Sequence, residues 1–220
     1  MKLNTQSLPE RINELFESAS EVDDSLIQWF VQCVRENCIQ TSQRIRSGTT
    51  ALVATWVILW AIANGFVQQG RISSFEFTNL ESLLVFGPVI IGILSYNIYS
   101  ALVSNAFYNK TLRLLIKHTC KKAYELNLDD YLLPSTIFNT ENIALQRGNI
   151  PGWLDIIQFF WAALFLIFIL MSSLIIFAHV SYLMFVTPKS YLIPKITSTL
   201  IGLIFWLRGF LLITLLFVKY

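Results

Sequence analysis

The sequence predicts an all-α integral membrane protein with four transmembrane helices and additional amphipathic helices outside the bilayer. Its 220 residues are 55% hydrophobic and only 14% charged, whereas about a quarter of the residues of soluble proteins are charged. Four stretches, residues 47–70, 82–109, 156–188 and 196–218, are uncharged apart from Arg208. Each exceeds the roughly 20 residues that a helix needs to cross a bilayer, and none has the alternating polarity of a membrane β-barrel strand.

The positive charges outside these stretches predict the orientation. Eleven lysines and arginines fall before the first stretch or between the second and the third, and three fall in the two other loops. Because cytoplasmic loops are enriched in these residues, we expect both termini and the central loop to be cytoplasmic. The first 46 residues carry 12 charges and no apolar run. We therefore expect no cleavable signal peptide, and a multi-pass protein of the cell's inner (plasma) membrane.

Residues 1–46 are expected to form amphipathic cytoplasmic helices. Ser7 and Glu10 have the spacing of a capping box, which predicts a first helix over residues 8–19. A second helix should begin near Asp23 or Asp24, since acidic side chains favour a helix N-terminus, and should continue into the first span. The apolar side chains of this second helix recur at helical spacing: Ile27, Phe30, Val34 and Cys38.

Residues 47–109 are expected to form a hairpin of the first two spans, with a kink at Gly87-Pro88 near the outer end of the second span. No helix breaker follows before Pro134, so this helix should continue to about residue 126. Its extension has one basic face and one apolar face. The basic face suits anionic lipid headgroups and comprises Lys110, Arg113, Lys117 and Lys121, whereas Leu112, Leu115, Ile116, Thr119 and Ala123 form the apolar face.

The rest of the cytoplasmic region, within residues 110–152, should contain a short helix over residues 141–146 and a turn at Pro151-Gly152. Residues 153–220 should form the hairpin of the third and fourth spans, because only residues 187–194 join them. The chain has no internal repeat and no separable soluble region, so we expect one structural domain.

Polar side chains recur at helical spacing inside the predicted spans. In a bilayer such side chains face the bundle interior or a water-filled cavity, so they are candidates either for contacts between helices or for a pore. The candidates are Arg208, Asn97, Tyr96, Ser100, Trp60, Gln158, Ser172 and His179.

Arg208 lies about 15 Å from the inner end of the fourth span, at 1.5 Å per residue, and therefore near the middle of the membrane. An arginine there costs about 2.5 to 3.5 kcal/mol on insertion scales. Three explanations are open: a clamp through Asn97, Tyr96 or Trp60, a cavity, pore or anion site, and snorkelling to the headgroups. Nearby, Gly202 and Gly209 offer a small-residue strip for close approach of another helix, which could belong to a second copy of the chain.

The sequence offers little for enzymatic chemistry. Cys33, Cys38 and Cys120 should all be cytoplasmic, where structural disulfides are rare. With His118 they could converge on zinc, although their spacing matches no zinc pattern. We therefore expect no catalytic residues, no cofactor and no metal. A net charge of +2 also argues against a nucleic-acid partner.

Two resemblances bear on function. Arg113 and His118 have the spacing of the R-x4-H motif of HEPN ribonucleases, with Leu114 in place of the usual polar residue. In layout, the chain resembles small multi-span membrane components of bacterial antiphage defence systems. This likeness implies a homo-oligomer in the lipid bilayer that forms or gates a pore or perturbs the membrane. The alternative is a non-conducting anchor or sensor that recruits a soluble cytoplasmic protein, and a third reading is an RNA- or nucleotide-acting effector.

Overall fold

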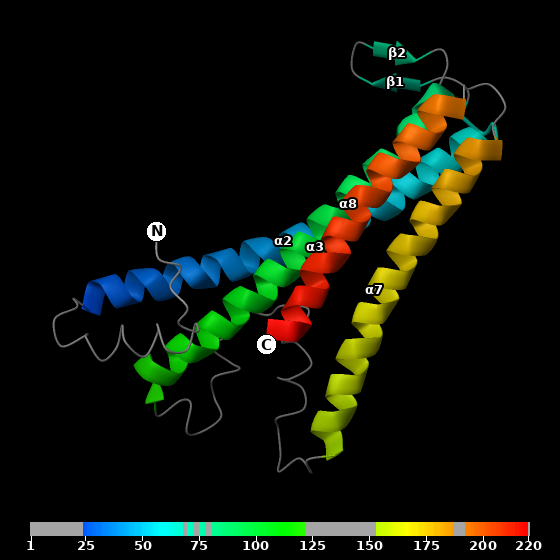
Figure 1. Ribbon diagram of the computed structural model, residues 1–220. Coiled ribbons are helices and arrows are strands. Elements are labelled where there is room, and N and C mark those ends of the chain that lie inside the picture. Colours follow the sequence, from blue (N-terminus) through cyan, green and yellow to red (C-terminus); the bar gives the residue numbers. More distant parts are fainter. Residues whose placement is uncertain are drawn as a thin grey trace, which may run out of the picture. The chain divides into compact units, whose positions relative to one another are not determined.

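Four long helices and one short β-hairpin make up the part of the chain that the computed structural model describes, which is residues 24–67, 70–72, 75–77, 81–121, 153–186 and 192–219 (Figure 1). The four helices are long and apolar enough to span a membrane, so the predicted multi-pass membrane fold is confirmed at this level. They are α2 (Asp24–Ala63), α3 (Glu81–Thr119), α7 (Trp153–Val186) and α8 (Leu192–Lys219). The helices predicted over residues 8–19 and 141–146 lie outside the described residues.

Helix α2 begins at Asp24 and runs without a break to Ala63, which confirms the predicted continuity between the second amphipathic helix and the first span. Its C-terminus is set by Gly65, which adopts a left-handed φ of 75°. The amides of Gly65 and Phe66 donate to the carbonyls of Ile62 and Ala61, over 3.1 and 3.0 Å. This is the glycine-terminated helix end that satisfies the last free carbonyls.

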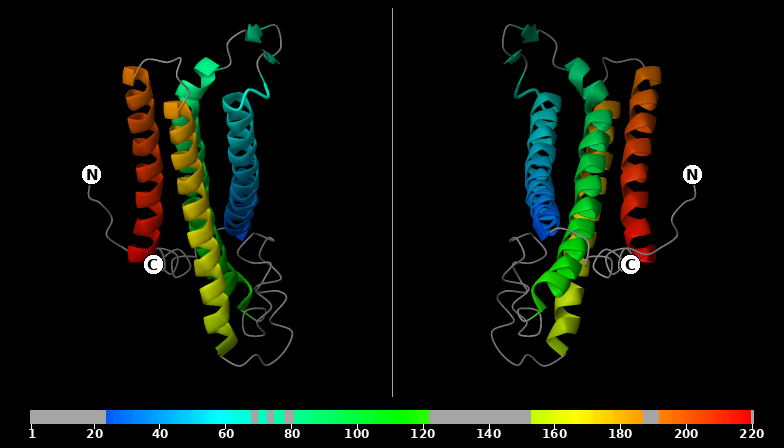
Figure 2. Two further views of the ribbon diagram at one scale, coloured as in Figure 1. Left: turned by 90° about the vertical axis from the view of Figure 1, so that its right-hand side faces the viewer. Right: turned by 90° about the vertical axis from the view of Figure 1, so that its left-hand side faces the viewer.

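A two-stranded antiparallel hairpin follows α2 and was not predicted. Strands β1 (Gly70–Ile72) and β2 (Phe75–Phe77) pair Gly70 with Phe77 and Ile72 with Phe75. Both views of Figure 2 place it beyond the ends of α2 and α3. Three-residue strands give too short an alternation for a period-2 pattern to stand out, so the sequence did not reveal this hairpin. The fold class is nevertheless all-α, as predicted.

Helix α3 is continuous through Gly87 and Pro88 to Thr119. Pro88 has no amide hydrogen, so it cannot donate to the carbonyl of Leu84 four residues earlier. The helix extends ten residues beyond the predicted span, which ended at Asn109, and this confirms that it continues past the span. The predicted continuation from residue 122 to 126 lies outside the described part of the chain.

Helices α7 and α8 form the predicted antiparallel hairpin. Trp206 reaches Ser173 while Lys195, eleven residues earlier in α8, reaches Phe185, twelve residues later in α7. Helix α7 ends directly before Thr187-Pro188 because a residue that precedes proline disfavours helical geometry. Helix α8 begins at Leu192, four residues before the predicted span, since Pro194 is tolerated in a first turn.

The chain groups into two compact units. Unit 1 comprises residues 1–43 and 104–158, and unit 2 comprises residues 44–103 and 159–220. Helices α2, α3 and α7 each contribute to both units, so the single structural domain stays a prediction. The two units are described separately below.

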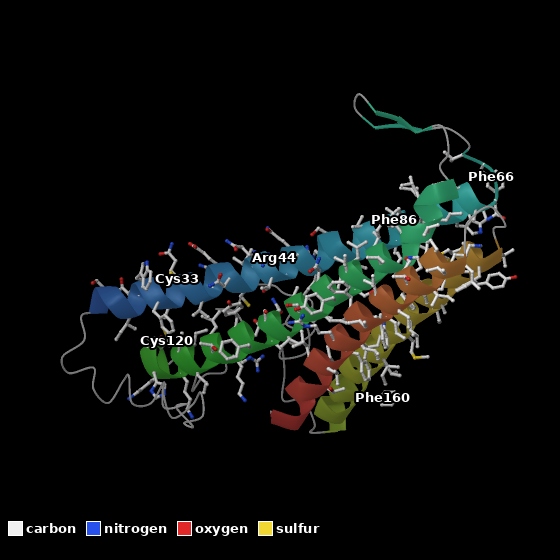
Figure 3. All side chains as sticks on the ribbon, turned by 45° about the horizontal axis from the view of Figure 1, so that its top comes forward. Cys33, Arg44, Phe66, Phe86, Cys120 and Phe160 are labelled. Atoms are coloured by element: carbon white, nitrogen blue, oxygen red, sulfur yellow. The ribbon has the colours of Figure 1, made fainter. Side chains whose placement is uncertain are left out.

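Unit 1 is built on an apolar contact between the first half of α2 and the last part of α3. Val34 of α2 is buried against Leu112, Leu115 and Ile116 of α3, and Phe30 packs on the edge of this cluster. These are the apolar faces that helical spacing predicts for the two segments. Thr119 departs from the prediction because it is exposed and its hydroxyl bonds back to Leu115. Figure 3 marks the two helices by Cys33 and Cys120.

Unit 2 is organised around the first part of α3, which contacts the other three helices. It meets α2 where Gly48 lies against Ile98, and α7 where Tyr99 lies against Ser173. It approaches α8 most closely at Gly92 and Gly202, where an added Cβ on either glycine would overlap backbone atoms of the other helix. Only glycine permits this approach.

Candidate functional site

The glycine strip of α8 faces α3 of the same chain rather than a second copy. Gly202 abuts Gly92 and the Pro88 carbonyl, and Gly209 abuts Tyr99 and the backbone of Tyr96. These contacts advance together along both helices, so α3 and α8 run parallel. The predicted close approach is confirmed, and its partner is intramolecular.

Arg208 lies on the exposed side of this α3–α8 pair. Its side chain is exposed, and the guanidinium carbon lies 5.5 Å from the centre of the Tyr96 ring. Tyr96 itself packs edge-on against Phe205 of α8, with ring centres 6.3 Å apart. Within the part of the chain that the structure describes, the Arg208 guanidinium makes this cation–π contact and no hydrogen bond.

Asn97 is exposed next to Tyr96, on a stripe of α3 that is otherwise apolar. Phe86, Ile90 and Ile93 precede it at steps of four and three residues and are also exposed. Tyr96 contacts α8 at Phe205 and Arg208, so Asn97 and Arg208 lie at the same level of two adjacent parallel helices. Two strongly polar groups therefore interrupt one apolar face of unit 2 at a single depth. We call Arg208, Tyr96 and Asn97 the polar face.

Two free energies bear on whether the polar face is stable in a membrane: the insertion cost of Arg208 and the gain from its contact with Tyr96. Placing an arginine at the bilayer centre costs about 2.5 to 3.5 kcal/mol. A cation–π contact returns about 0.5 to 1 kcal/mol where it is exposed and about 2 kcal/mol where it is desolvated. At that depth, Tyr96 alone would therefore leave part of the cost uncompensated.

The buried polar centre of unit 2 consists of residues that the sequence analysis missed. The indole N–H of Trp206 donates to the Ser173 hydroxyl over 3.0 Å, and the same hydroxyl bonds to the Tyr99 hydroxyl. All three residues are buried. The predicted stripe passed through Ser172 instead, and Ser172 is half-buried and bonds back to Ile169 in its own helix.

His179, a predicted candidate, joins α7 to α2. The indole N–H of Trp56 donates to its Nδ1 over 2.9 Å. The ring planes are inclined at 74°, with centres 6.0 Å apart. Because an indole only donates, Nδ1 must be the unprotonated nitrogen of a neutral imidazole.

The other predicted polar candidates lie apart from this centre. Trp60, a candidate for a contact between helices, is 42% exposed and lies against Phe66 after the end of α2, with ring centres 5.5 Å apart and planes inclined at 34°. Ser100 is half-buried on α3. Gln158 lies in α7, and its side chain is outside the described set. Periodicity identified polar faces but not which residue on each face meets a neighbour.

Unit 1 holds a second buried polar cluster, at the crossing of α2 and α3. The Cys38 thiol donates to the side-chain oxygen of Asn109 over 2.9 Å, and the Asn109 amide donates to Asn105 over the same distance. Asn105 in turn donates to the Cys38 carbonyl and to the Thr41 hydroxyl. The polar groups of this cluster hydrogen-bond to one another, so we interpret it as a structural contact that holds α2 against α3.

The basic face of α3 runs along the surface of unit 1. Lys110 and Arg113 are half-buried, whereas Lys117 and Lys121 are exposed. Arg113 and His118 lie about 140° apart around the helix, at 100° per residue, so they do not share a face. In the residues that the structure describes, no group of His, Cys, Asp and Glu could hold a metal ion, and Cys33, Cys38, Cys120 and His118 do not converge.

Comparison of this chain with family models, with curated proteins and with solved structures finds no match.

Proposed function

We propose that this protein is a homo-oligomeric, multi-pass membrane protein whose copies surround a polar pathway lined by the polar face. The carrying observation is the exposure of Arg208 on α8, a helix long and apolar enough to span a membrane. If this face met lipid, the guanidinium would keep about 0.5 to 1.5 kcal/mol of its insertion cost even with the Tyr96 contact. A water-filled pathway between copies removes that cost, since it hydrates Arg208 and Asn97 together.

In this proposal the membrane is the cell's inner membrane and unit 1 is cytoplasmic. The distribution of lysine and arginine supports this sidedness. Lys117 and Lys121 are exposed at the end of α3, where they can meet anionic headgroups or a cytoplasmic trigger. Because α2 and α3 are unbroken helices, a change at unit 1 can be passed along them to gate the pathway.

Cysteine crosslinking tests whether copies meet at the polar face. Asn97→Cys would be introduced together with Cys33→Ser and Cys120→Ser, leaving the fully buried Cys38 in place. We expect crosslinked dimers and higher species in proteoliposomes. The matched control is Ile175→Cys on α7, which is 62% exposed and lies at about the same depth but on another helix. It should crosslink far less.

Flux measurements complete the test. Purified wild-type protein in liposomes should release a trapped ion, and Arg208→Leu should change that flux while the oligomer is retained. A monomer in nanodiscs, or equal crosslinking at positions 97 and 175, would contradict the proposal.

One observation favours a second function, a non-conducting anchor or sensor that recruits a soluble protein. Trp29, on the unit 1 part of α2, is 62% exposed, and exposed tryptophans often anchor protein interfaces. An oligomer that passes no ions, together with a purified partner whose binding is lost in Trp29→Ser, would favour this function over the pore.

A further inference from the structure

The formal charges inside the predicted spans have one sign. Residues 47–63, 82–109, 156–186 and 192–214 contain no aspartate or glutamate, and their only formal charges are Lys195 and Arg208. Lys195 is buried near the start of α8, where its ammonium donates to the Phe185 carbonyl over 3.4 Å. That position stabilises the end of α7, where the helix dipole is negative. Arg208 is therefore the charge available to a permeating ion.

Among the residues that the structure describes, none accepts a hydrogen bond from Arg208, which makes a cation–π contact with Tyr96. A guanidinium has five N–H donors and no acceptor, and it stays charged at any physiological pH. Its cation–π contact with Tyr96 uses a ring face and no N–H group. Asn97, exposed at the same level, adds a carboxamide that can donate two further hydrogen bonds. These groups match a small anion, which needs positive charge and N–H donors.

We infer that the pathway conducts small inorganic anions such as chloride, and that Arg208 is the residue that selects them. This inference rests on the proposed pore. In a homo-oligomer each copy places one guanidinium at the same depth. Rings of arginine or lysine favour anions in pores, as rings of carboxylates favour cations. The spans carry no carboxylate at that depth that would favour a cation.

Reversal potentials in a potassium chloride gradient across a planar bilayer test the inference. Wild-type current should reverse near the chloride equilibrium potential, and Arg208→Lys, which keeps the charge, should behave alike. Arg208→Gln should move the reversal potential toward zero, and Arg208→Glu should move it toward the potassium value. The control is Leu211→Gln, at a position that is 59% exposed on the same helix, which adds polarity without removing charge and should leave selectivity unchanged.

A second variant tests the inference even if the Arg208 variants fail to fold. Asn97→Asp places a carboxylate beside an intact Arg208 and should reduce the preference for chloride several-fold. A wild-type current that prefers potassium, or an unchanged reversal potential in both Arg208→Gln and Asn97→Asp, would overturn anion selection and leave the pore standing. An oligomer that passes no current would overturn both the pore and the selectivity.

Discussion

The indole N–H of Trp206 donates a hydrogen bond to the Ser173 hydroxyl over 3.0 Å, inside unit 2. Since Ser173 also bonds to the Tyr99 hydroxyl, one serine ties α7 to both α3 and α8. Removing this hydroxyl takes a hydrogen-bond partner from two buried groups, the Trp206 N–H and the Tyr99 hydroxyl. An unsatisfied buried polar group costs about 1 to 3 kcal/mol, although hydrogen bonds measured in membranes average only about 0.6 kcal/mol.

We therefore expect Ser173→Ala to lower the free energy of unfolding by about 1 to 2 kcal/mol, measured by thermal or detergent-induced unfolding. The control is Ser181→Ala on the same helix. Ser181 is also buried, but its hydroxyl has no hydrogen-bond partner among the described residues, so its removal should be neutral or slightly stabilising. Equal losses in the two variants would show that the Ser173 hydrogen bonds contribute nothing specific.

The bond between Trp56 and His179 predicts energetic coupling between α2 and α7. His179→Phe and Trp56→Phe each keep an aromatic ring and remove one partner of the hydrogen bond. In a double-mutant cycle, the double variant should lose less stability than the sum of the two single losses. The expected coupling is about 0.6 to 1.7 kcal/mol, the range for side-chain hydrogen bonds in membranes. Strictly additive losses would contradict this link.

The four spans could be predicted from the sequence because long uncharged runs have almost no other explanation in a chain this apolar. The faces of α2 and α3 in unit 1 could be predicted as well. Val34 and Leu112 are separated in the sequence by the first two spans, yet each lies on a clear apolar stripe. The lengths of the helices and their amphipathic faces depend on residues that are close together in the sequence, so they could be predicted directly.

Which residues meet inside unit 2 could not be predicted in the same way. A stripe drawn at steps of three and four residues fixes a face only to within one neighbouring position. The stripe therefore selected Ser172, whereas the residue that is buried between the helices is its neighbour Ser173. The polar face was anticipated through Arg208, Tyr96 and Asn97. Its outward orientation was not, because orientation depends on how α3 and α8 pack, and that is set by the pairing of Gly92 with Gly202.

This glycine pairing leads to a further prediction. A Cβ at Gly202 would overlap the backbone carbonyl of Pro88, which cannot move without displacing α3. Gly202→Ala should therefore lower the free energy of unfolding by about 2 to 3 kcal/mol, the upper part of the range for overpacked sites. The control is Gly48→Ala, whose Cβ would meet only the side chain of Ile98, at 2.9 Å. Since that side chain can shift, a loss of less than half as much is expected, and equal losses would argue against a close α3–α8 contact.

The polar cluster of unit 1 predicts the reactivity of the thiols. Cys38 has no exposed surface and its thiol donates to Asn109, whereas Cys120 is exposed. In nanodiscs, a maleimide should modify Cys120 rapidly and Cys38 only after the protein is unfolded, with each site identified by mass spectrometry. Fast labelling of Cys38 in the folded protein would contradict the buried thiol.

The Asn109 bond also sets how often Cys38 becomes accessible, because labelling requires local opening of the α2–α3 crossing. Asn109→Ala removes the acceptor of the thiol and the donor to Asn105. If opening becomes easier by about 1 to 1.4 kcal/mol, the value of one to two lost hydrogen bonds, Cys38 labelling should accelerate about fivefold to tenfold. Thr111→Val is the matched control. Thr111 is buried on the same helix, but in the described part of the chain its hydroxyl bonds to Phe107 of its own helix and to no other helix, so the labelling rate of Cys38 should stay at the wild-type value. Acceleration in both variants would show that α3 loosens as a whole, and acceleration in Asn109→Ala alone would assign the closed state of the crossing to the hydrogen bonds of Asn109.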